Sequence, residues 1–529
     1  MNLDKDLQSI QEARNLAAAA KEAQLEFKHF NQEQVDKVVK AMVDAGMKEA
    51  ERLARMAHEE TGFGKVSDKI IKNQFATRDV WESIKDLKTV GVIDVQKNGK
   101  IVKIAEPMGV VAALVPSTNP TSTAMFKAII SLKCRNGIVV SPHPKAMNCT
   151  REALKVISDA AEKAGAPKGL IQCLSLPTLE ATNALMHDKN IAIILATGGM
   201  PMVHAAYSAG KPAYGVGAGN VPAFIERTAN IQKAVADIVY GTTFDNGTLC
   251  SSEQAMVVDR PIREKVIAEA KKIGCYFVNE EEKRKLENKV AKGAKLNPDI
   301  VGKSAAWIAN YAGFSVPENT TVLIVECNKV GKDEPLSIEK LSPMLAFYTV
   351  DNWMEGCHRC IELLEFGGIG HTLAIHSNDK DIIMKFALEK PAFRIVVNTP
   401  SSVGAVGYST GLTPSMTLGP GTWGGSIISE NVSAVHLMNV KTLAFETKEI
   451  NKGNCVSSFD DKVTRTNFSA HSNEGSFTKE IEERLKARAG NPVVNPFGVS
   501  DSLKPKSTST LGSGITESEI QKIIKEFSK

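Results

Sequence analysis

The chain contains 529 residues, of which 43% are hydrophobic and 23% are charged. A chain of this length can bury two or three sizeable cores, which excludes a single small module. Its 64 basic and 60 acidic residues leave a formal net charge of only +4. This balance provides no field that would indicate a nucleic-acid partner, so we expect small molecules and other protein chains instead.

The sequence shows no signal for a membrane, a secretory route or a metal site. No apolar run approaches the roughly 20 residues that span a bilayer, and no hydrophobic secretory segment follows Met1. Nine cysteines are scattered along the chain, and the C-x-x-C at Cys357 and Cys360 has no second pair to complete a zinc site. We expect a soluble cytoplasmic protein with reduced thiols and no metal.

The first 90 residues have helical spacing of their apolar side chains, as in Val35, Val38, Val39 and Met42. From Gly109 the pattern changes to short apolar runs at 109–116, 137–142 and 191–199, separated by helical stretches. Buried strands that alternate with helices predict a doubly wound α/β sheet.

Ligands of such sheets bind beyond the carboxyl ends of the strands. Those ends carry Ser117–Pro120, Ser141–Pro144 and Thr197–Gly199. The last of these lacks the full G-x-G-x-x-G fingerprint, so a simple turn after a strand remains an alternative. The glycine-rich segment 215–220, which includes Gly217, indicates a close approach of the backbone under either interpretation.

Cys250 lies in the segment 243–254, where small and polar residues surround the thiol. A cysteine that only fills space in a core is the commonest kind. Here asparagine, glycine and serine neighbours offer backbone N–H donors and an open approach, which a covalent intermediate on sulfur needs. The segment therefore favours a nucleophilic role for Cys250.

The end of the chain has a different character. Residues 449–514 are polar and turn-prone and finish in a Ser, Thr and Gly linker. Residues 515–529 predict an amphipathic helix, with a capping box from Thr516 to Glu519 and one apolar stripe. A helix this short needs a surface to dock on, and its own catalytic domain or an oligomer partner would serve.

The order and spacing of these pieces resemble the aldehyde dehydrogenase superfamily, and within it the CoA-acylating branch. That branch includes the aldehyde dehydrogenase half of bifunctional aldehyde–alcohol dehydrogenases. The similarity runs from about residue 10 to about residue 448. The matching motifs, all in the family's order, are 116–123, 141–146, 244–250, 339–343, 367–372 and 412–419.

The resemblance implies roles for individual residues. Cys250 corresponds to the nucleophile, and Asn119 to the asparagine whose amide stabilises the oxyanion together with the nucleophile's backbone N–H. Glu339 corresponds to the glutamate that binds the nicotinamide ribose of NAD. The alternatives are an Asx turn for Asn119 and a solvated surface charge for Glu339. The further cofactor-binding positions are Ser141, His143, Pro144, Thr197, Gly198, Gly199 and Gly217.

Two positions depart from the hydrolytic members of the family. The glutamate that activates the deacylating water in those enzymes is replaced here by Val216, and a valine cannot accept a proton. A thioester on Cys250 would then wait for a better acceptor, and the thiol of coenzyme A fits. Ser141 replaces the lysine near the adenosine ribose, which predicts a rebuilt nucleotide pocket.

The implied reaction is the reversible conversion of a short aldehyde, such as acetaldehyde or propionaldehyde, with NAD and CoA to acyl-CoA and NADH. A charged C2 aldehyde such as sulfoacetaldehyde is the alternative substrate. Rival hypotheses are a hydrolytic aldehyde dehydrogenase, a phosphate-coupled reductase of the wider superfamily, and an assembly or cargo-recruiting protein with a vestigial site.

The family also implies an architecture. We expect a coenzyme-binding domain at 1–228 interrupted by a hairpin at 88–106, a catalytic domain at 229–424, and an oligomerisation arm at 425–448 that pairs with the hairpin. A homodimer or homotetramer is expected. Residues 515–529 are similar to encapsulation peptides, which predicts shell-protein partners and a place in the lumen of a bacterial microcompartment.

Overall fold

The computed structural model describes residues 4–292 and 295–450. Its chain begins with the helices that the apolar spacing predicts. The side chain of Asn31 accepts a hydrogen bond from the backbone of Gln34 and so begins one of them, and Gly62 ends another in the left-handed region at φ 67°. These elements are α1 (Lys5–Phe27), α2 (Gln32–Lys48), α3 (Ala50–Thr61), α4 (Val66–Gln74), the π-helix η1 (Phe75–Asp79) and α5 (Val80–Ile84).

A five-stranded sheet follows, with strand order β5-β4-β3-β6-β7 and parallel pairing throughout. The three apolar runs predicted as strands are its β3, β4 and β6, which confirms the α/β class. The strands are β3 (Val110–Val115), β4 (Gly137–Pro142), β5 (Ile171–Cys173), β6 (Ile191–Thr197) and β7 (Ala213–Val216). The helices between them are α6 (Pro120–Lys133), α7 (Met147–Lys163), α8 (Leu179–His187) and α9 (Met200–Tyr207).

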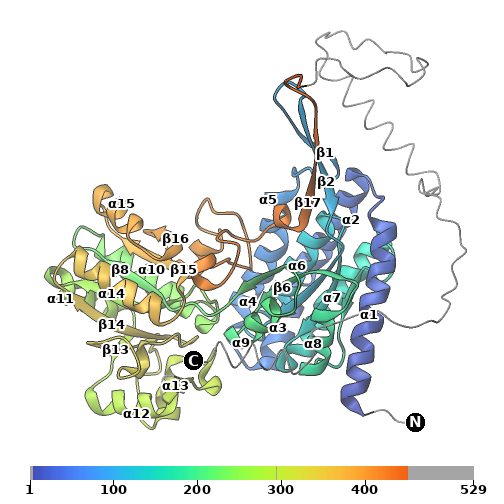
Figure 1. Ribbon diagram of the computed structural model, residues 1–529. Coiled ribbons are helices and arrows are strands. Elements are labelled where there is room, and N and C mark those ends of the chain that lie inside the picture. The colour runs from blue at the N-terminus through green and yellow to red at the C-terminus, as the bar shows by residue number, and fades with distance from the viewer. Residues whose placement is uncertain (1–3, 293–294, 451–529) are drawn as a thin grey trace, which may run out of the picture. The chain divides into compact units, whose positions relative to one another are not determined.

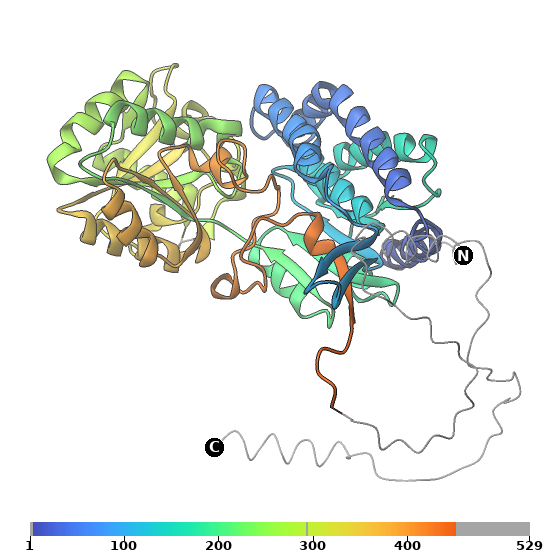
Figure 2. The same ribbon diagram turned by 90° about the horizontal axis from the view of Figure 1, so that it is seen from above.

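A seven-stranded sheet forms the second α/β part, with order β10-β13-β14-β9-β8-β15-β16. In Figure 2 its strands run between green helices on one side and orange-brown helices on the other. The strands are β8 (Val221–Ile225), β9 (Glu253–Asp259), β10 (Cys275–Phe277), β13 (Val322–Glu326), β14 (Met344–Val350), β15 (Gly370–His376) and β16 (Ala392–Val397). The helices are α10 (Ile231–Thr243), α11 (Arg263–Lys272), α12 (Glu280–Val290), α13 (Ala305–Ala312), α14 (Trp353–Phe366), α15 (Lys380–Leu388) and α16 (Ser401–Ala405).

The change from one sheet to the other falls earlier than the domain boundary expected at 228. β8 pairs with β9 and β15, so it belongs to the seven-stranded sheet. All five of its residues are buried, and such a strand carries no polar face that would tell from sequence which sheet it joins. The structure thus places the change between β7 and β8.

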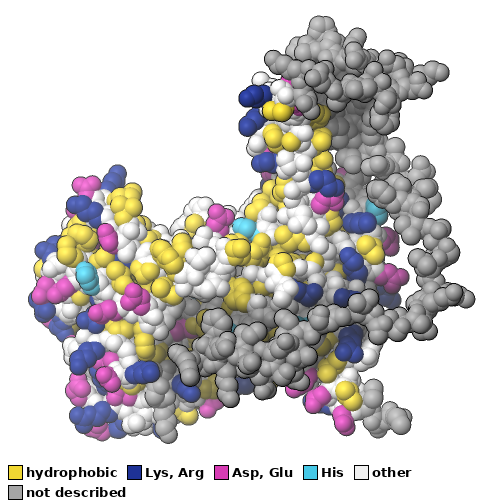
Figure 3. Space-filling view, viewed as in Figure 1, with side chains coloured by type: hydrophobic (Ala, Val, Ile, Leu, Met, Phe, Trp, Pro, Cys, Tyr) yellow, Lys and Arg dark blue, Asp and Glu magenta, His cyan; other side chains and the backbone are white. Residues whose placement is uncertain are grey.

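A small antiparallel sheet combines two distant segments of the chain. β1 (Gly91–Gln96) and β2 (Ile101–Pro107) form a hairpin that ends one residue beyond the expected range 88–106, and β17 (Met438–Ala444) pairs with β2 so that Val440 lies opposite Ala105. Figure 1 shows the three strands side by side. Val440 and Leu443 remain exposed on β17, and yellow side chains mark this sheet in Figure 3. Its role as an oligomerisation arm remains a prediction.

Short elements complete the described chain. They are the strands β11 (Ala291–Lys292) and β12 (Lys295–Leu296) and the 3₁₀ helices η2 (Pro144–Ala146), η3 (Phe244–Gly247), η4 (Arg260–Ile262), η5 (Pro298–Ile300), η6 (Pro335–Ser337), η7 (Thr422–Gly424) and η8 (Ala434–Leu437). Within the described ranges, no helix combines the length and the hydrophobicity that crossing a membrane requires. On the face shown in Figure 3, basic and acidic side chains are interspersed.

One apolar core connects the two α/β parts near the loop that carries Cys250. It contains Ile130 of α6 and Ile225 of β8, and also Phe244 and Leu249 on either side of the predicted thiol loop. Cys250 packs against the same cluster. The loop that carries the thiol is therefore fixed to a continuous core. The predicted extension and linker at 449–514 lie outside the described residues from position 451 on, and so does the predicted helix at 515–529.

Candidate active site

The loop that carries Cys250 has an unusual backbone. After α10, the residues Asp245, Asn246 and Gly247 have φ values of 49°, 52° and 72°, all in the left-handed region. This conformation costs a non-glycine residue about 1–2 kcal/mol. Asn246 offsets part of this cost because its Nδ2 donates to the carbonyl of Gly302 at 2.9 Å. The turn brings the thiol to the start of β9.

Cys250 itself is half-buried. The pKa of its thiol is raised to about 12, chiefly by burial and then by the nearby carboxylate of Glu339, whereas the guanidinium of Arg394 opposes this rise. The thiol is therefore neutral at pH 7 in the protein alone. Its reaction as a nucleophile requires a group that takes up its proton or a change in the charges around it.

Asn119 lies beside this loop although it is far from Cys250 in sequence. Its Nδ2 donates to the carbonyl of Thr248 at 3.3 Å, and its Oδ1 accepts from Nζ of Lys72 at 2.6 Å. Asn119 is the N-cap residue of α6, yet its side chain makes no capping hydrogen bond. The Asx-turn alternative is therefore wrong, because Lys72 holds the oxygen that such a turn would use.

Glu339 also reaches the thiol loop. Its Oε1 accepts a hydrogen bond from the backbone of Gly219 at 3.0 Å. A Cβ atom added to Gly219 would lie 2.2 Å from the carbonyl oxygen of Cys250, so only glycine allows this approach. Burial raises the pKa of Glu339 to about 7, and the N–H of Gly219 opposes this rise. Glu339 is thus not the solvated surface charge of the alternative interpretation.

The predicted nucleotide positions lie at the carboxyl ends of β4, β6 and β7. Ser141 is buried, and its hydroxyl is already hydrogen-bonded to that of Thr182 on α8 at 2.8 Å. His143 accepts from the backbone of Lys145 at 3.1 Å, and burial, followed by the charge of Lys145, lowers the pKa of its imidazole. Pro144 begins η2 directly after it.

The other predicted positions surround the start of α9. The hydroxyl of Thr197 lies 3.3 Å from that of Thr417, and the N–H of Gly198 donates to the carbonyl of Val216 at 3.2 Å. Gly199 is the N-cap residue of α9. A Cβ atom on Gly217 would lie 2.3 Å from the sulfur of Met200. The structure brings these residues together at one edge of the sheet, and their binding role remains a prediction.

Val216 is the last residue of β7 and is 1% exposed. It pairs with Thr197 of β6, so the position that holds the base in hydrolytic enzymes is an aliphatic strand residue here. Its side chain can neither take up a proton nor orient a water molecule.

Two further groups near the thiol were missed by the sequence interpretation. His371 is buried, and its Nδ1 lies 3.1 Å from the Cβ position of Gly219. Burial, followed by the charge of Arg394, lowers the pKa of His371 to about 3, and its Nε2 has no hydrogen-bond partner among the described residues. The only sequence signal was its place in the motif 367–372, to which no role had been given.

Arg394 is a buried cation on β16. Its guanidinium donates to the carbonyl of Gly419 at 2.8 Å, and its Nε has no partner within the described chain. Burial lowers the pKa of Arg394 to about 10, and the adjacent Cys250 acts in the opposite direction. A buried cation beside the thiol favours the thiolate over the neutral form.

A buried charge cluster supports the loop from the other side. Nζ of Lys69 lies 2.9 Å from the carboxylate of Asp245, and Lys72 contacts the same oxygen. The hydroxyl of Thr248 donates to it at 2.7 Å. Burial lowers the pKa of Lys72 to about 8, although Asp245 raises it. Nothing in the sequence joined α4 to this loop.

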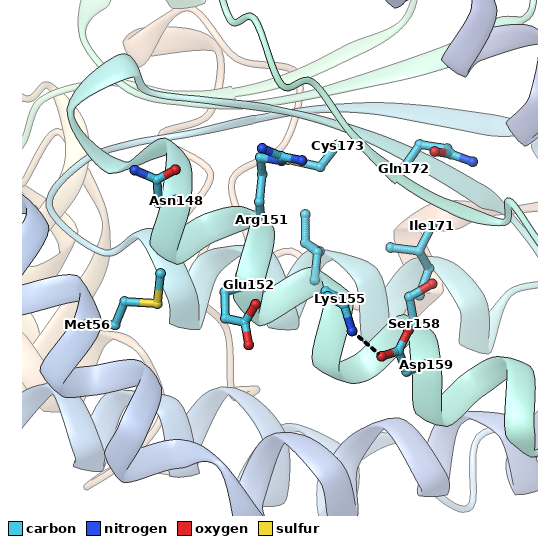
Figure 4. Close-up of a pocket in the computed structure, with 11 residues that line it drawn as sticks. Met56, Asn148, Arg151, Glu152, Lys155, Ser158, Asp159, Ile171, Gln172 and Cys173 are labelled. Carbon is cyan, nitrogen blue, oxygen red and sulfur yellow. Dashed lines mark hydrogen bonds and ion pairs between the residues drawn. The ribbon is translucent and has the colours of Figure 1, made fainter.

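Two cavities lie away from these residues. One of about 470 Å³ is open along α7, and Figure 4 shows Arg151 of that helix beside Cys173 of β5 and Lys155 paired with Asp159. Another of about 480 Å³ lies against β7 and includes Tyr214 and Ile427. None of the predicted site residues lines either cavity.

The fold and the thiol loop together agree with one protein family. The sequence model described as "Aldehyde dehydrogenase family" matches residues 6–325, which is more than half of the chain. The chain belongs to the aldehyde dehydrogenase family. Cys250 and Asn119 both lie inside the matched range, whereas Glu339, His371 and Arg394 follow it.

The relatives within the family include bifunctional enzymes. The chain is 47% identical over 426 residues to aldehyde-alcohol dehydrogenase 2 of Entamoeba histolytica, which covers 78% of this chain and 49% of the relative. The chain thus spans about half the length of such relatives. It is 38% identical over 437 residues to the acetylating succinate-semialdehyde dehydrogenase of Clostridium kluyveri, covering 82% of this chain and 96% of the relative.

A solved structure of an aldehyde dehydrogenase is also similar to this chain. The crystal structure of an acetylating aldehyde dehydrogenase from Geobacillus thermoglucosidasius is 52% identical and superimposes with a TM-score of 0.84. The match covers 85% of this chain and 100% of the other. The family's α/β architecture is therefore present in this chain.

Proposed function

We propose that this chain is a CoA-acylating aldehyde dehydrogenase. It converts an aldehyde, NAD⁺ and CoA reversibly to acyl-CoA, NADH and a proton through a thioester on Cys250. The observation that carries the proposal is Val216, the aliphatic residue at the position of the hydrolytic base. Without that base, water is a poor acceptor for the acyl group, and a thiol is a better one.

The first steps take place at the thiol. The thiol of Cys250 loses its proton to solvent, its sulfur forms a bond to the aldehyde carbon, and the carbonyl oxygen becomes an oxyanion. Nδ2 of Asn119 and the backbone N–H of Cys250 donate hydrogen bonds to this oxygen. Loss of hydride from the carbon then leaves a thioester, so the aldehyde is oxidised by two electrons.

NAD, when bound, supplies the acceptor of that hydride. Glu339 fits its ribose, because the carboxylate lies beside the thiol loop and can accept hydrogen bonds from hydroxyl groups. Gly199, whose Cβ position lies 3.8 Å from the nearest atom, leaves room for an approach of the nucleotide to the backbone, whereas the space beside Gly217 is filled by Met200. The hydroxyl of Ser141 is held by Thr182, so we assign Ser141 to the lining of the pocket rather than to hydrogen bonding with the nucleotide.

The second half of the reaction transfers the acyl group. The thiol of CoA attacks the thioester carbon, the bond to Cys250 breaks, and acyl-CoA leaves. His371 is the candidate to take up the proton of the incoming thiol, because its Nε2 has no hydrogen-bond partner among the described residues. Burial and the charge of Arg394 lower its pKa to about 3, so it would hold that proton only briefly. A 29% identical propionaldehyde dehydrogenase of Rhodopseudomonas palustris, with a TM-score of 0.73, has been solved with bound CoA and an acylated cysteine.

For the aldehyde we propose a short aliphatic chain, either acetaldehyde or propionaldehyde. Small side chains surround Cys250, and the name of the propionaldehyde dehydrogenase among the relatives gives such a substrate. A charged C2 aldehyde is the second candidate, since a sulfoacetaldehyde dehydrogenase of an Acholeplasma species is 38% identical over 433 residues.

We also propose that residues 515–529 carry the enzyme into a bacterial microcompartment by binding a shell protein. The capping box and the apolar stripe of this segment support the proposal. A 32% identical relative is the propionaldehyde dehydrogenase of a fucose-utilisation microcompartment of Clostridium phytofermentans. We propose a homodimer or homotetramer whose subunits meet through the sheet of β1, β2 and β17.

The acyl-enzyme provides the test of this function. Incubation with aldehyde and NAD but without CoA should add one acyl group to Cys250, detected by intact-protein and peptide mass spectrometry. Cys250→Ala should abolish the adduct, and added CoA should remove it from the wild type as acyl-CoA. Release of the acyl group to water as fast as to CoA would contradict the proposal.

A further inference from the structure

The ammonium group of Lys72 connects the buried charge cluster to the candidate oxyanion donor. Lys72 lies on α4 and is 4% exposed. Its Nζ donates to Oδ1 of Asn119 at 2.6 Å, contacts the carboxylate of Asp245 and lies 3.4 Å from the hydroxyl of Thr248. One buried cation thus touches both the side chain that would bind the oxyanion and the loop that carries the thiol.

An ammonium group has hydrogen-bond donors and no acceptor, so only the oxygen of an amide can face it. Lys72 therefore determines which end of the Asn119 amide points away from it. Nδ2 is directed to the carbonyl of Thr248 at 3.3 Å and to the hydroxyl of Thr118 at 3.1 Å. Both contacts are longer than the usual 2.9–3.0 Å of such bonds, which leaves this donor weakly engaged.

We propose that Lys72 is a positioning residue for Asn119, which fixes the amide with its N–H toward Cys250 and polarises that N–H through the charge-assisted bond to Oδ1. The inference deepens the proposed function and rests on it, because it takes Asn119 as the donor to the oxyanion. A hydrogen bond from a cation to the amide oxygen strengthens the donor at the other end of the same amide.

A comparison with Lys69 shows that the role of Lys72 is more than pairing with the charge of Asp245. Lys69 contacts Asp245 at 2.9 Å, and that carboxylate also accepts from the backbone of Lys65 and the hydroxyl of Thr248, each at 2.7 Å. Asp245 is therefore well satisfied without a second lysine. A further buried cation is unfavourable unless a specific partner compensates for its desolvation. The partner that distinguishes Lys72 from Lys69 is Oδ1 of Asn119.

The test uses a reaction that needs neither NAD nor CoA. With p-nitrophenyl acetate, the Cys250 sulfur bonds to the acetyl carbon, the C–O bond breaks, p-nitrophenolate leaves, and the thiol proton passes to the buffer. The burst of p-nitrophenolate measures acylation of Cys250 alone. Asn119→Ala should slow the burst about 100-fold, as loss of an oxyanion donor does. Lys72→Met should slow it about tenfold, because the cation no longer orients the amide.

The double variant gives the decisive comparison. If Lys72 acts through Asn119, then Lys72→Met together with Asn119→Ala should be no slower than Asn119→Ala alone. Lys72→Arg, which keeps the cation, should recover part of the lost rate. The matched control is Lys69→Met, which removes the same charge from the same carboxylate and should slow the burst no more than about twofold.

If the double variant slows the burst by the product of the two single effects, the proposal is overturned. It is also overturned if Lys69→Met and Lys72→Met slow the burst equally. If Lys72→Met does not fold, as judged by circular dichroism and Tm, Lys72→Gln and Lys72→Arg replace it, alone and combined with Asn119→Ala. A wild type that lacks a Cys250-dependent burst would also overturn it. A wild type with a normal burst but no acyl-CoA product would refute the proposed function while leaving the role of Lys72 standing.

Discussion

The thiol of Cys250 lies between a carboxylate and a guanidinium that act on it in opposite directions. Its pKa is raised to about 12, chiefly by burial and then by Glu339, whereas Arg394 opposes this rise. The thiol is therefore neutral in the protein alone. Any change that removes the negative charge of Glu339, including its protonation near pH 7, shifts the balance toward the thiolate.

This balance predicts opposite effects of one substitution in two assays. Glu339→Gln removes a negative charge beside the thiol, so alkylation of Cys250 by iodoacetamide at pH 8 should become about three- to tenfold faster. NADH formation should become slower, because the carboxylate proposed to bind the ribose is lost. Peptide mass spectrometry of Cys250 over time measures the rate of alkylation. Unchanged or slower labelling would show that Glu339 does not oppose the thiolate.

The predictability of the site differs from residue to residue. Cys250, Asn119 and Glu339 lie in motifs that resemble the family. The structure brings Asn119 to the loop that carries Cys250 and places the carboxylate of Glu339 close enough to raise the pKa of the thiol. The contact of Lys72 with this loop could not be predicted, because it depends on how α4 packs against a turn of left-handed residues. The sequence could not decide between the two roles of Asn119 for the same reason, since the donor to its Oδ1 comes from another element.

At the scale of elements, Glu253 connects the start of β9 to the start of α16. Its Oε1 accepts from the backbone of Ser401 at 2.5 Å, and its Oε2 has no partner in the part of the chain that the structure describes. Burial raises the pKa of Glu253 to about 8, and the hydrogen bond from Ser401 only partly opposes this. The folded protein thus keeps this carboxyl protonated at pH 7.

The sign of the resulting pH dependence follows from linkage. The folded-state pKa is about 8 and the ordinary value is 4.5, so the stabilisation is complete below pH 4.5 and is lost as the pH rises to about 8. Between these values the free energy of unfolding should fall by about 1.4 kcal/mol per pH unit from this group. Glu253→Gln, which cannot ionise, should remove that part of the slope.

Urea unfolding of the wild type and of Glu253→Gln at several values between pH 5 and pH 8 measures this difference directly. The variant should gain stability relative to the wild type as the pH rises. Parallel pH profiles would show that Glu253 does not hold its proton in the folded state.

The strands themselves were easier to predict than their sheets. Short apolar runs marked β3, β4 and β6 because buried parallel strands have little polar interruption. β8 has the same composition and joins the other sheet, since its partners β9 and β15 lie later in the chain. Local pattern indicates a buried strand, but only the assembled fold selects its neighbours.

At the scale of the whole molecule, residues 515–529 either bind a shell protein or dock on the catalytic part of the chain, and a deletion distinguishes these two hypotheses. Deleting residues 515–529 should leave turnover in solution within about twofold of the full chain, if the segment acts only as an address. Co-sedimentation with microcompartment shell proteins should be lost. A matched variant with Ile520 and Ile524 changed to Asp should behave like the deletion, because it removes the apolar stripe. Loss of turnover in either variant would instead favour a helix that docks on the catalytic part.

The central claim concerns the fate of the acyl group, and steady-state turnover tests it most directly. NADH formation from acetaldehyde and from propionaldehyde should be measured with and without CoA, with products identified by mass spectrometry. The account predicts CoA-dependent NADH formation and acyl-CoA as the product. NADH formed at the same rate without CoA, with free acid as the product, would contradict it and would mean that a hydrolytic base exists despite Val216.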